Sequence, residues 1–219
     1  MPSHHFPLEH LSEYANGSLG MARSLAVASH LSLCRECHQY YLELESLGGL
    51  LLDRLDETAM SEGCLDSLLA RLDEPAAQPA RDLGCEPDVV LPQPLRRHLG
   101  RSIRNLPWHE ITSYLSVFDV PSGGTPGKGR ETIRLMRIKA GHPMPRHTHG
   151  GEEITLVLAG AFSDEHGFYE RGDVAVANEN IEHRPVAHAS GDCICLAVTD
   201  APVRLTGGVG RLLNPFLKF

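Results

Sequence analysis

The sequence predicts an α+β chain of two parts, a small all-α bundle followed by an all-β barrel or sandwich. Three observations favour this order. Apolar residues recur at helical spacing up to about residue 74, prolines crowd residues 74–94, and short segments rich in β-branched residues follow from about residue 111. With 219 residues, the chain is long enough for one large domain or two small ones, each with its own core.

The first third is expected to be helical, and its clearest amphipathic pattern lies near its end. Four leucines there follow the spacing i, i+3, i+4 and i+7: Leu65, Leu68, Leu69 and Leu72. Ser61 is expected to cap this helix at its N-terminus. The leucine stripe is either a partner-binding face or the core-facing side of its own domain.

Five prolines between Glu74 and Pro94 predict an extended linker. The expected domains are therefore a helical domain at 1–75, a Pro-rich linker at 76–97, a β-barrel domain at 98–203 and a C-terminal tail at 204–219. Strand-like segments are expected near residues 111–119, 131–139, 154–162, 173–177 and 193–199, with turns rich in Gly and Pro between them.

The net charge of −8 comes entirely from the N-terminal third. Residues 1–75 hold twelve acidic and four basic residues, whereas the rest of the chain holds sixteen of each. Direct nucleic-acid binding is disfavoured, because phosphate recognition needs basic patches. An acidic module suits a basic protein partner, although a solvated acidic surface also serves solubility alone.

No apolar run approaches the roughly 20 residues that a membrane helix needs, and the first residues lack the pattern of a secretion signal. We therefore expect a cytoplasmic protein without a membrane partner. In that compartment the six cysteines are expected to be metal ligands or free thiols rather than a disulfide framework.

A first cluster of metal-ligand residues has the spacing H-x3-C-x2-C, with His30, Cys34 and Cys37. Two thiolates and an imidazole favour zinc, which takes four ligands in structural sites. The spacing alone leaves the fourth ligand open among His4, His5, His10 and His38. The alternatives are a redox pair or two buried thiols beside a surface histidine.

A second cluster lies more than a hundred residues later. His147, His149 and Glu153 share the alternation of a strand, and His183 follows in a later strand-like segment. Glu152 has the opposite parity and is expected to point away. Three imidazoles and a carboxylate suit Zn, Mn, Fe, Ni or Cu, and the spacing does not choose among them. The alternative is a set of surface histidines in a chain that has thirteen.

The spacing G-x5-H-x-H-x3-E-x6-G, from Gly141 to Gly160, resembles the first motif of the cupin superfamily. The second cupin motif is matched in part, by Gly172-Asp173 and by His183, whereas the usual Pro-x-Gly is missing. The resemblance implies a small β-barrel across about residues 98–200. It also implies a divalent metal held by His147, His149, Glu153 and His183, with Zn²⁺ as the first expectation.

The first cluster resembles the zinc-binding anti-sigma domain, and this resemblance implies Zn²⁺ with His5 as the fourth ligand, His4 being the adjacent alternative. The order of zinc domain, Pro-rich linker and cupin is similar to the ChrR family of anti-sigma factors. That family implies one-to-one binding of an extracytoplasmic-function sigma factor, which is kept from core RNA polymerase. Release would follow singlet oxygen or organic hydroperoxides acting through the cupin.

Two other functions are considered beside that of an anti-sigma factor, and four cysteines belong to neither metal-ligand cluster. Cupins with such metal ligands are often dioxygenases or isomerases, for which Glu152, Tyr169 and Arg146 are candidate acids or bases. A one-component transcription factor is disfavoured by the acidic N-terminal third. The remaining cysteines match no metal motif: Cys64, Cys85, Cys193 and Cys195. The last two share a strand face, and are expected to be either inert buried thiols or oxidisable groups near the metal.

Overall fold

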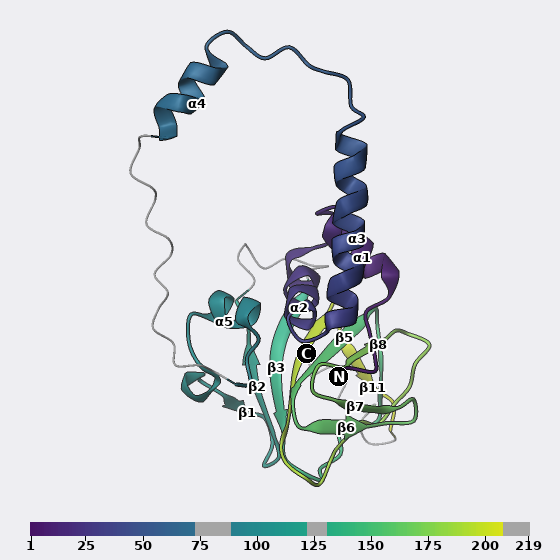
Figure 1. Cartoon of the computed structure of the whole chain (residues 1–219). Coiled ribbons are helices and arrows are strands. Elements are labelled where there is room, and N and C mark those ends of the chain that lie inside the picture. Colours follow the sequence, from purple (N-terminus) through teal and green to yellow (C-terminus); the bar gives the residue numbers. More distant parts are fainter. Residues whose placement is uncertain (73–88, 122–130, 208–219) are drawn as a thin grey trace.

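The computed structural model describes residues 1–72, 89–121 and 131–207. Within these ranges helices come first and strands follow, which confirms the predicted α+β order (Figure 1). No helix in the described ranges is long and apolar enough to cross a membrane.

The N-terminal module consists of α1 (Leu8–Ala15), α2 (Met21–Leu31), α3 (Arg35–Leu52) and α4 (Cys64–Leu72). Helix α2 is the central one, because it contacts α1, α3 and the barrel. Ser61 is not the cap of α4, so that expectation was wrong. Gly63, with a φ of 75°, stands between Ser61 and the helix, and only the Ser61 carbonyl reaches the helix, by accepting from the Cys64 amide.

The barrel is antiparallel and is built from three sheets. The largest has the order β1-β2-β3-β10-β5-β8, a second pairs β11 with β4, and a third has the order β7-β6-β9. The strands are β1 His109–Glu110, β2 Leu115–Asp119, β3 Thr132–Ile138, β4 His147–His149, β5 Glu153–Ala159, β6 Ala161–Ser163, β7 Phe168–Glu170, β8 Val174–Ala177, β9 Val186–Ala187, β10 Cys193–Thr199 and β11 Val203–Leu205.

The central strands β5 and β10 of the six-stranded sheet are buried on both faces. On β5, Ile154, Leu156 and Leu158 belong to a core that also contains Ala26 and Val27 of α2. The opposite face of the same strand points into the barrel, where a second apolar cluster joins the large sheet to the three-stranded one. A strand that is covered on both faces needs apolar residues at nearly every position, and this explains the sequence EITLVLA of β5. The helical module and the barrel therefore share one core.

Helix α5 (Gln93–Leu99) begins inside the segment expected to be linker. Leu91 and Leu95 are buried in the shared core, and α5 packs against α2. The prolines favoured a linker, but Pro92 and Pro94 stand at the start of the helix, where their fixed φ is tolerated. The expected tail likewise begins within β11, which pairs with β4. Residues 73–88 and 208–219 lie outside the described residues.

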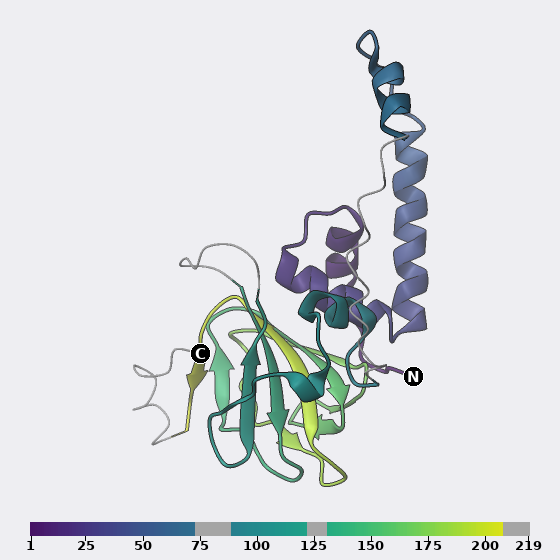
Figure 2. The same cartoon turned by 90° about the vertical axis from the view of Figure 1, so that its left-hand side faces the viewer.

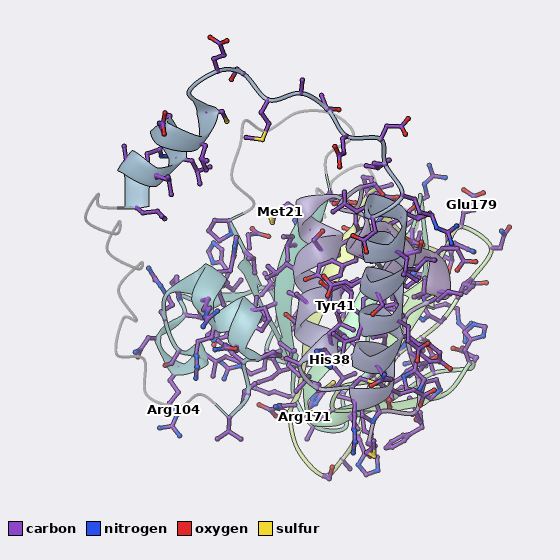
Figure 3. All side chains as sticks on the ribbon, turned by 45° about the horizontal axis from the view of Figure 1, so that its top comes forward. Met21, His38, Tyr41, Arg104, Arg171 and Glu179 are labelled. Atoms are coloured by element: carbon purple, nitrogen blue, oxygen red, sulfur yellow. The ribbon has the colours of Figure 1, made fainter. Side chains whose placement is uncertain are left out.

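The second half of α3 and all of α4 extend away from the rest of the molecule (Figures 1 and 2). Side chains of α4 stand clear of the body that carries Met21 and Tyr41 (Figure 3). The four leucines of the α4 stripe are 49–72% exposed, so the stripe is not packed in its own domain. Six further apolar residues of this arm are at least half exposed: Leu47, Leu50, Leu51, Leu52, Leu55 and Met60.

Candidate metal centres

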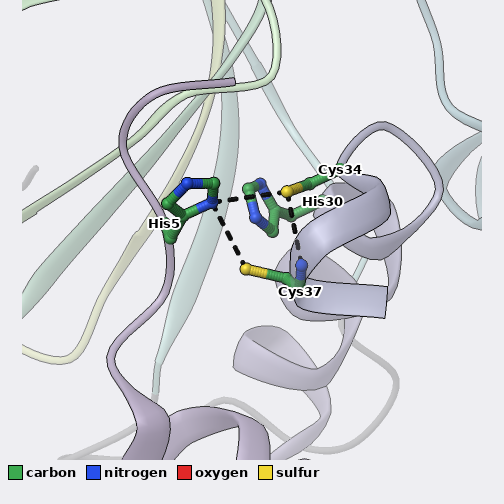
Figure 4. Close-up of side chains that lie close together, drawn as sticks. All are labelled: His5, His30, Cys34 and Cys37. Atoms are coloured by element: carbon green, nitrogen blue, oxygen red, sulfur yellow. Dashed lines mark hydrogen bonds between the residues drawn. The ribbon is translucent and has the colours of Figure 1, made fainter. Parts of the chain in front are cut away.

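The N-terminal cluster brings together residues from three separate elements (Figure 4). His5 lies on the segment before α1, His30 near the end of α2, and Cys34 and Cys37 at the start of α3. One potential ligand atom from each of the four lies within 4.8 Å of the others. Cys34 is the N-cap residue of α3, and its sulfur accepts from the Cys37 amide, so helix capping and metal-ligand geometry use the same turn.

The donor atoms of this cluster lie close enough together to hold one metal ion. The Nδ1 atom of His5 lies 3.3 Å from the Cys34 sulfur and 3.5 Å from the Cys37 sulfur. The Nε2 atom of His30 is buried and has no hydrogen-bond partner. A buried imidazole nitrogen without a partner beside two thiols is what a two-His, two-Cys zinc site requires.

The other three histidines considered for this site lie elsewhere. The ring of His4 packs on Tyr169, and His10 contacts the Glu152 carboxylate at 3.1 Å. His38 faces outward on α3 near Tyr41. The structure thus groups His5, and none of these three, with His30, Cys34 and Cys37.

Protonation in this cluster is set by burial. Desolvation lowers the pKa of His30 to about 4, so this imidazole is neutral and able to act as a ligand at physiological pH. Burial, followed by the neighbouring Cys34 sulfur, raises the pKa of Cys37 to about 12. A divalent cation reverses the second effect, because thiolates bind metal with release of their protons.

The barrel cluster is built around three imidazoles. His147 and His149 are the first and last residues of β4, and His183 is joined to His147 by a β-bridge. The Nε2 atom of His183 lies 3.0 Å from that of His147 and 3.1 Å from that of His149. Glu153 is the first residue of β5, and its carboxylate lies 3.3 Å from His149 Nδ1. The Glu153 side chain points into the barrel because of the alternation along β5. It does not share a strand with His147 and His149, which lie on β4.

Hydrogen bonds on the far side of the rings show that this cluster is ready for a cation. His147 Nδ1 donates to the Pro145 carbonyl at 2.7 Å, and His183 Nδ1 donates to the Asp164 carboxylate at 2.8 Å. When both rings are neutral, each Nε2 atom therefore carries a lone pair, and the two lone pairs face each other. A metal ion between them removes this repulsion, and the outer bonds orient the rings toward it.

Asp164 was not recognised in the sequence. Burial alone would raise the pKa of this carboxyl, but the His183 ring and the backbone amides of His166 and Gly167 together outweigh burial, and the pKa lies below its ordinary value. Burial would also raise the pKa of Glu153, but His149, His147 and the Thr155 hydroxyl together outweigh it and lower this pKa. Both carboxylates stay charged beside the imidazoles. The turn residues that follow β6, Asp164-Glu165-His166-Gly167, were the available signal, yet a turn pattern does not reveal which distant side chain it faces.

A cavity of about 340 Å³ fills the barrel beneath this cluster. His147, Glu153 and His183 line it together with mostly apolar side chains, among them Met136 and Phe162. Cys193 and Cys195 also line it, with their sulfurs 3.5 Å apart, so the expectation that both face the interior is confirmed. Contact with Cys193, followed by burial, raises the pKa of the Cys195 thiol well above its ordinary value.

The three candidate acids and bases for an enzyme do not line this cavity. Glu152 points to the helical module, where it meets His10 and Arg23, as its strand parity predicted. Arg146 pairs with Glu165 at the surface, and Tyr169 stacks on Phe162 and contacts the tilted ring of His4.

Together, these features define a two-module protein in which a helical domain with a two-His, two-Cys cluster is fused to a cupin barrel with its own metal-ligand residues. The family profile described as "ChrR Cupin-like domain" matches residues 96–203. The chain is 39% identical to the anti-sigma-E factor ChrR of Cereibacter sphaeroides over 98% of both chains. It also matches the crystal structure of Rhodobacter sphaeroides SigE in complex with the anti-sigma ChrR. That match has a TM-score of 0.78 and 38% identity, over 91% of this chain and 100% of the other.

The chain belongs to the ChrR family of anti-sigma factors. This relationship makes it a regulatory protein rather than an enzyme.

Proposed function

We propose that the chain binds an extracytoplasmic-function sigma factor one-to-one in the cytoplasm and keeps it from core RNA polymerase. The observation that carries this proposal is the exposed apolar arm formed by the second half of α3 and by α4. Leucines exposed in such density on one projecting element mark a binding surface, because they are costly to leave in water.

The charge of the arm suits the same partner. Residues 40–72 hold seven acidic and two basic residues. A sigma factor presents basic faces to DNA, so an acidic arm would steer association and compete for those faces. Exposed leucines would then supply most of the binding energy, as buried apolar anchors do in other interfaces.

We further propose that zinc is structural in the N-terminal module, held by His5, His30, Cys34 and Cys37. A second divalent ion, with Zn²⁺ as the first expectation, would be held in the barrel by His147, His149, Glu153 and His183. The first ion would join the N-terminal segment to α2 and α3, and so fix the base from which the arm projects. The second would supply a Lewis-acid centre at the top of the cavity, where an oxidative signal such as singlet oxygen or an organic hydroperoxide acts before the sigma factor is released.

The test uses the full-length chain as bait in extract from its own host, with captured proteins identified by mass spectrometry and the complex weighed by light scattering. A single small sigma factor at one-to-one stoichiometry supports the proposal. Capture of no sigma factor by a folded, zinc-loaded chain contradicts it.

The binding surface is tested with the same partner. Leu68→Ala is expected to weaken binding by about tenfold or more, since truncating an interface anchor costs about 1–2 kcal/mol or above. Val89→Ser is the matched control, because Val89 is 83% exposed but lies outside the arm. Equal affinities for Leu68→Ala and the wild type would place the binding surface elsewhere.

A further inference from the structure

The turn between β7 and β8, residues 170–174, lies directly against the N-terminal zinc-type cluster. His30 Nδ1 is 2.8 Å from the carbonyl oxygen of Gly172, to which it donates. This bond places the free Nε2 atom toward His5 and the two sulfurs. An outer contact of one metal centre is therefore supplied by the other module.

Asp173 of the same turn holds the chain segment that carries His5. Its side chain is fully buried, and Oδ1 accepts from the Ser3 amide at 2.6 Å and from the His4 amide at 3.0 Å. The other oxygen, Oδ2, accepts from the Glu170 amide at 2.8 Å, which closes the turn. The Val174 amide donates to the His4 carbonyl at 3.1 Å. The residue before His5 is thus fixed at both its N–H and its C=O.

Gly172 allows this close approach. Its φ of 94° is a backbone conformation that residues other than glycine rarely adopt. A Cβ atom at this position would lie 2.7 Å from Cγ of Pro2. The turn is therefore shaped to receive residues 2–4, which have no helix or strand of their own.

We propose that Asp173 of the cupin is a positioning residue for the N-terminal zinc site, which it completes by fixing residues 3 and 4 and thereby His5. The inference rests on the proposed zinc site and is independent of sigma-factor binding. A ligand on an irregular segment must be ordered before it can hold a metal, and the ordering of each residue costs about 1–2 kcal/mol. Because Asp173 orders two residues in advance, zinc is held more tightly and leaves more slowly.

Strand β7, which precedes the turn, packs against the wall of the barrel cavity. Phe162 lines the cavity and stacks on Tyr169 with ring centres 4.8 Å apart, and the Tyr169 ring lies 4.4 Å from that of His4. A contiguous row of packed rings therefore runs from the cavity to the residue beside His5.

The experiment measures zinc retention in the full-length chain. Zinc-loaded wild type, Asp173→Asn and a deletion of residues 2–4 are mixed with excess chelator and an alkylating reagent, and modification of Cys34 and Cys37 is followed by mass spectrometry. In parallel, Co²⁺ replaces zinc. The sulfur-to-cobalt absorption reports the N-terminal site, because its donor set contains sulfur whereas the barrel ligands offer nitrogen and oxygen only.

Asp192→Asn is the matched control, because its carboxylate also accepts a backbone amide, that of Ala140, but in a turn outside the zinc site. Asp173→Asn and the deletion are each expected to speed zinc loss by about 10- to 100-fold, the usual effect of an outer contact, and to alter the cobalt spectrum. The thermal transition is recorded for every variant, so that zinc loss is compared among folded proteins.

Wild-type rates and spectra in both folded variants would overturn the proposal, as would an equal acceleration in Asp192→Asn. If Asp173→Asn does not fold, the deletion decides alone, since it leaves the sequence of the barrel unchanged. A folded wild type without sulfur-to-cobalt absorption would overturn the zinc site and this inference together, and sigma-factor capture would then judge the regulatory function separately.

Discussion

Arg23 of α2 joins the helical module to the barrel through three carboxylates. Its guanidinium lies 3.0 Å from Asp200, 3.2 Å from Glu131 and 3.3 Å from Glu152. The Glu152 carboxylate also contacts His10 of α1 at 3.1 Å. Replacing Arg23 by Ala leaves three acidic groups facing one another at the interface of the two modules.

The size of the effect follows from the exposure of these groups. A hydrogen bond to a charged group contributes about 1.5–3 kcal/mol, but exposed ion pairs contribute less than about 1 kcal/mol. Arg23 is 23% exposed and the three carboxylates are 22–34% exposed, which places the contacts between these limits. We expect Arg23→Ala to lower the free energy of unfolding by about 2–3 kcal/mol. For a chain of this size that is a fall in Tm of about 5–10 °C.

The assay is differential scanning calorimetry of the full-length chain at low and high salt. The loss should shrink as salt is added, because screening weakens the repulsion among the remaining carboxylates. Arg104→Ala is the control, since Arg104 is exposed on the short 3-10 helix Ile103–Asn105 and should change stability by less than about 0.5 kcal/mol. If Arg23→Ala melts with the wild type at low salt, the contacts do not hold the modules together.

Leu196→Ala, which removes a fully buried side chain from the shared core, should cost about 2–5 kcal/mol in urea unfolding, and a loss close to zero would argue against a single core. Cys34→Ala should abolish sulfur-to-cobalt absorption and release the sigma factor, and tight binding by the zinc-free variant would refute a structural role of zinc. Burial would raise the pKa of Asp173, but three backbone amides outweigh burial and hold this pKa below 3.8, the ordinary value for an aspartate carboxyl. Its stabilisation is therefore complete above that pH and is lost as the pH falls through the lowered value, so wild type and Asp173→Asn should converge in acid. Because Cys195 is held as a thiol and the thiolate is the reactive form, Cys193→Ser and Cys195→Ser should release the partner normally with an organic hydroperoxide. A lost response would show that these thiols take part.

Local patterns predicted the fold where local chemistry decides it. The strand expected at 193–199 coincides with β10. Alternation along this strand places Cys193 and Cys195 toward the barrel interior, and Leu196 and Val198 toward the core shared with the helices. The donor residues of both clusters were recognisable because metal coordination demands particular residue types at short spacing. Helix α5 was missed, because its prolines point to a linker and only distant α2 makes burial of Leu95 favourable.

The contacts between the modules could not be predicted, because they depend on tertiary packing. Asp173 was visible only as part of the second cupin motif, and nothing near it in the sequence indicates that residues 3 and 4 supply its partners. Arg23 looked like one of four bases in an acidic third. The exposure of the leucine stripe on α4 also depends on packing, since the same periodicity suits a core-facing helix and a partner-binding one.

The two buried faces of strand β5 limit how the helical module and the barrel can be separated, either in the laboratory or during evolution. One face of the strand carries Glu153 and Thr155 toward the cavity, and the other carries Ile154, Leu156 and Leu158 toward the helices. A barrel cut free of its helical partner would expose that second face as a flat apolar sheet, which is prone to aggregate. Recombination that exchanged one module alone would have to supply a matching surface at once. The two halves are therefore expected to be inherited as a unit, although their sequences read as separate domains.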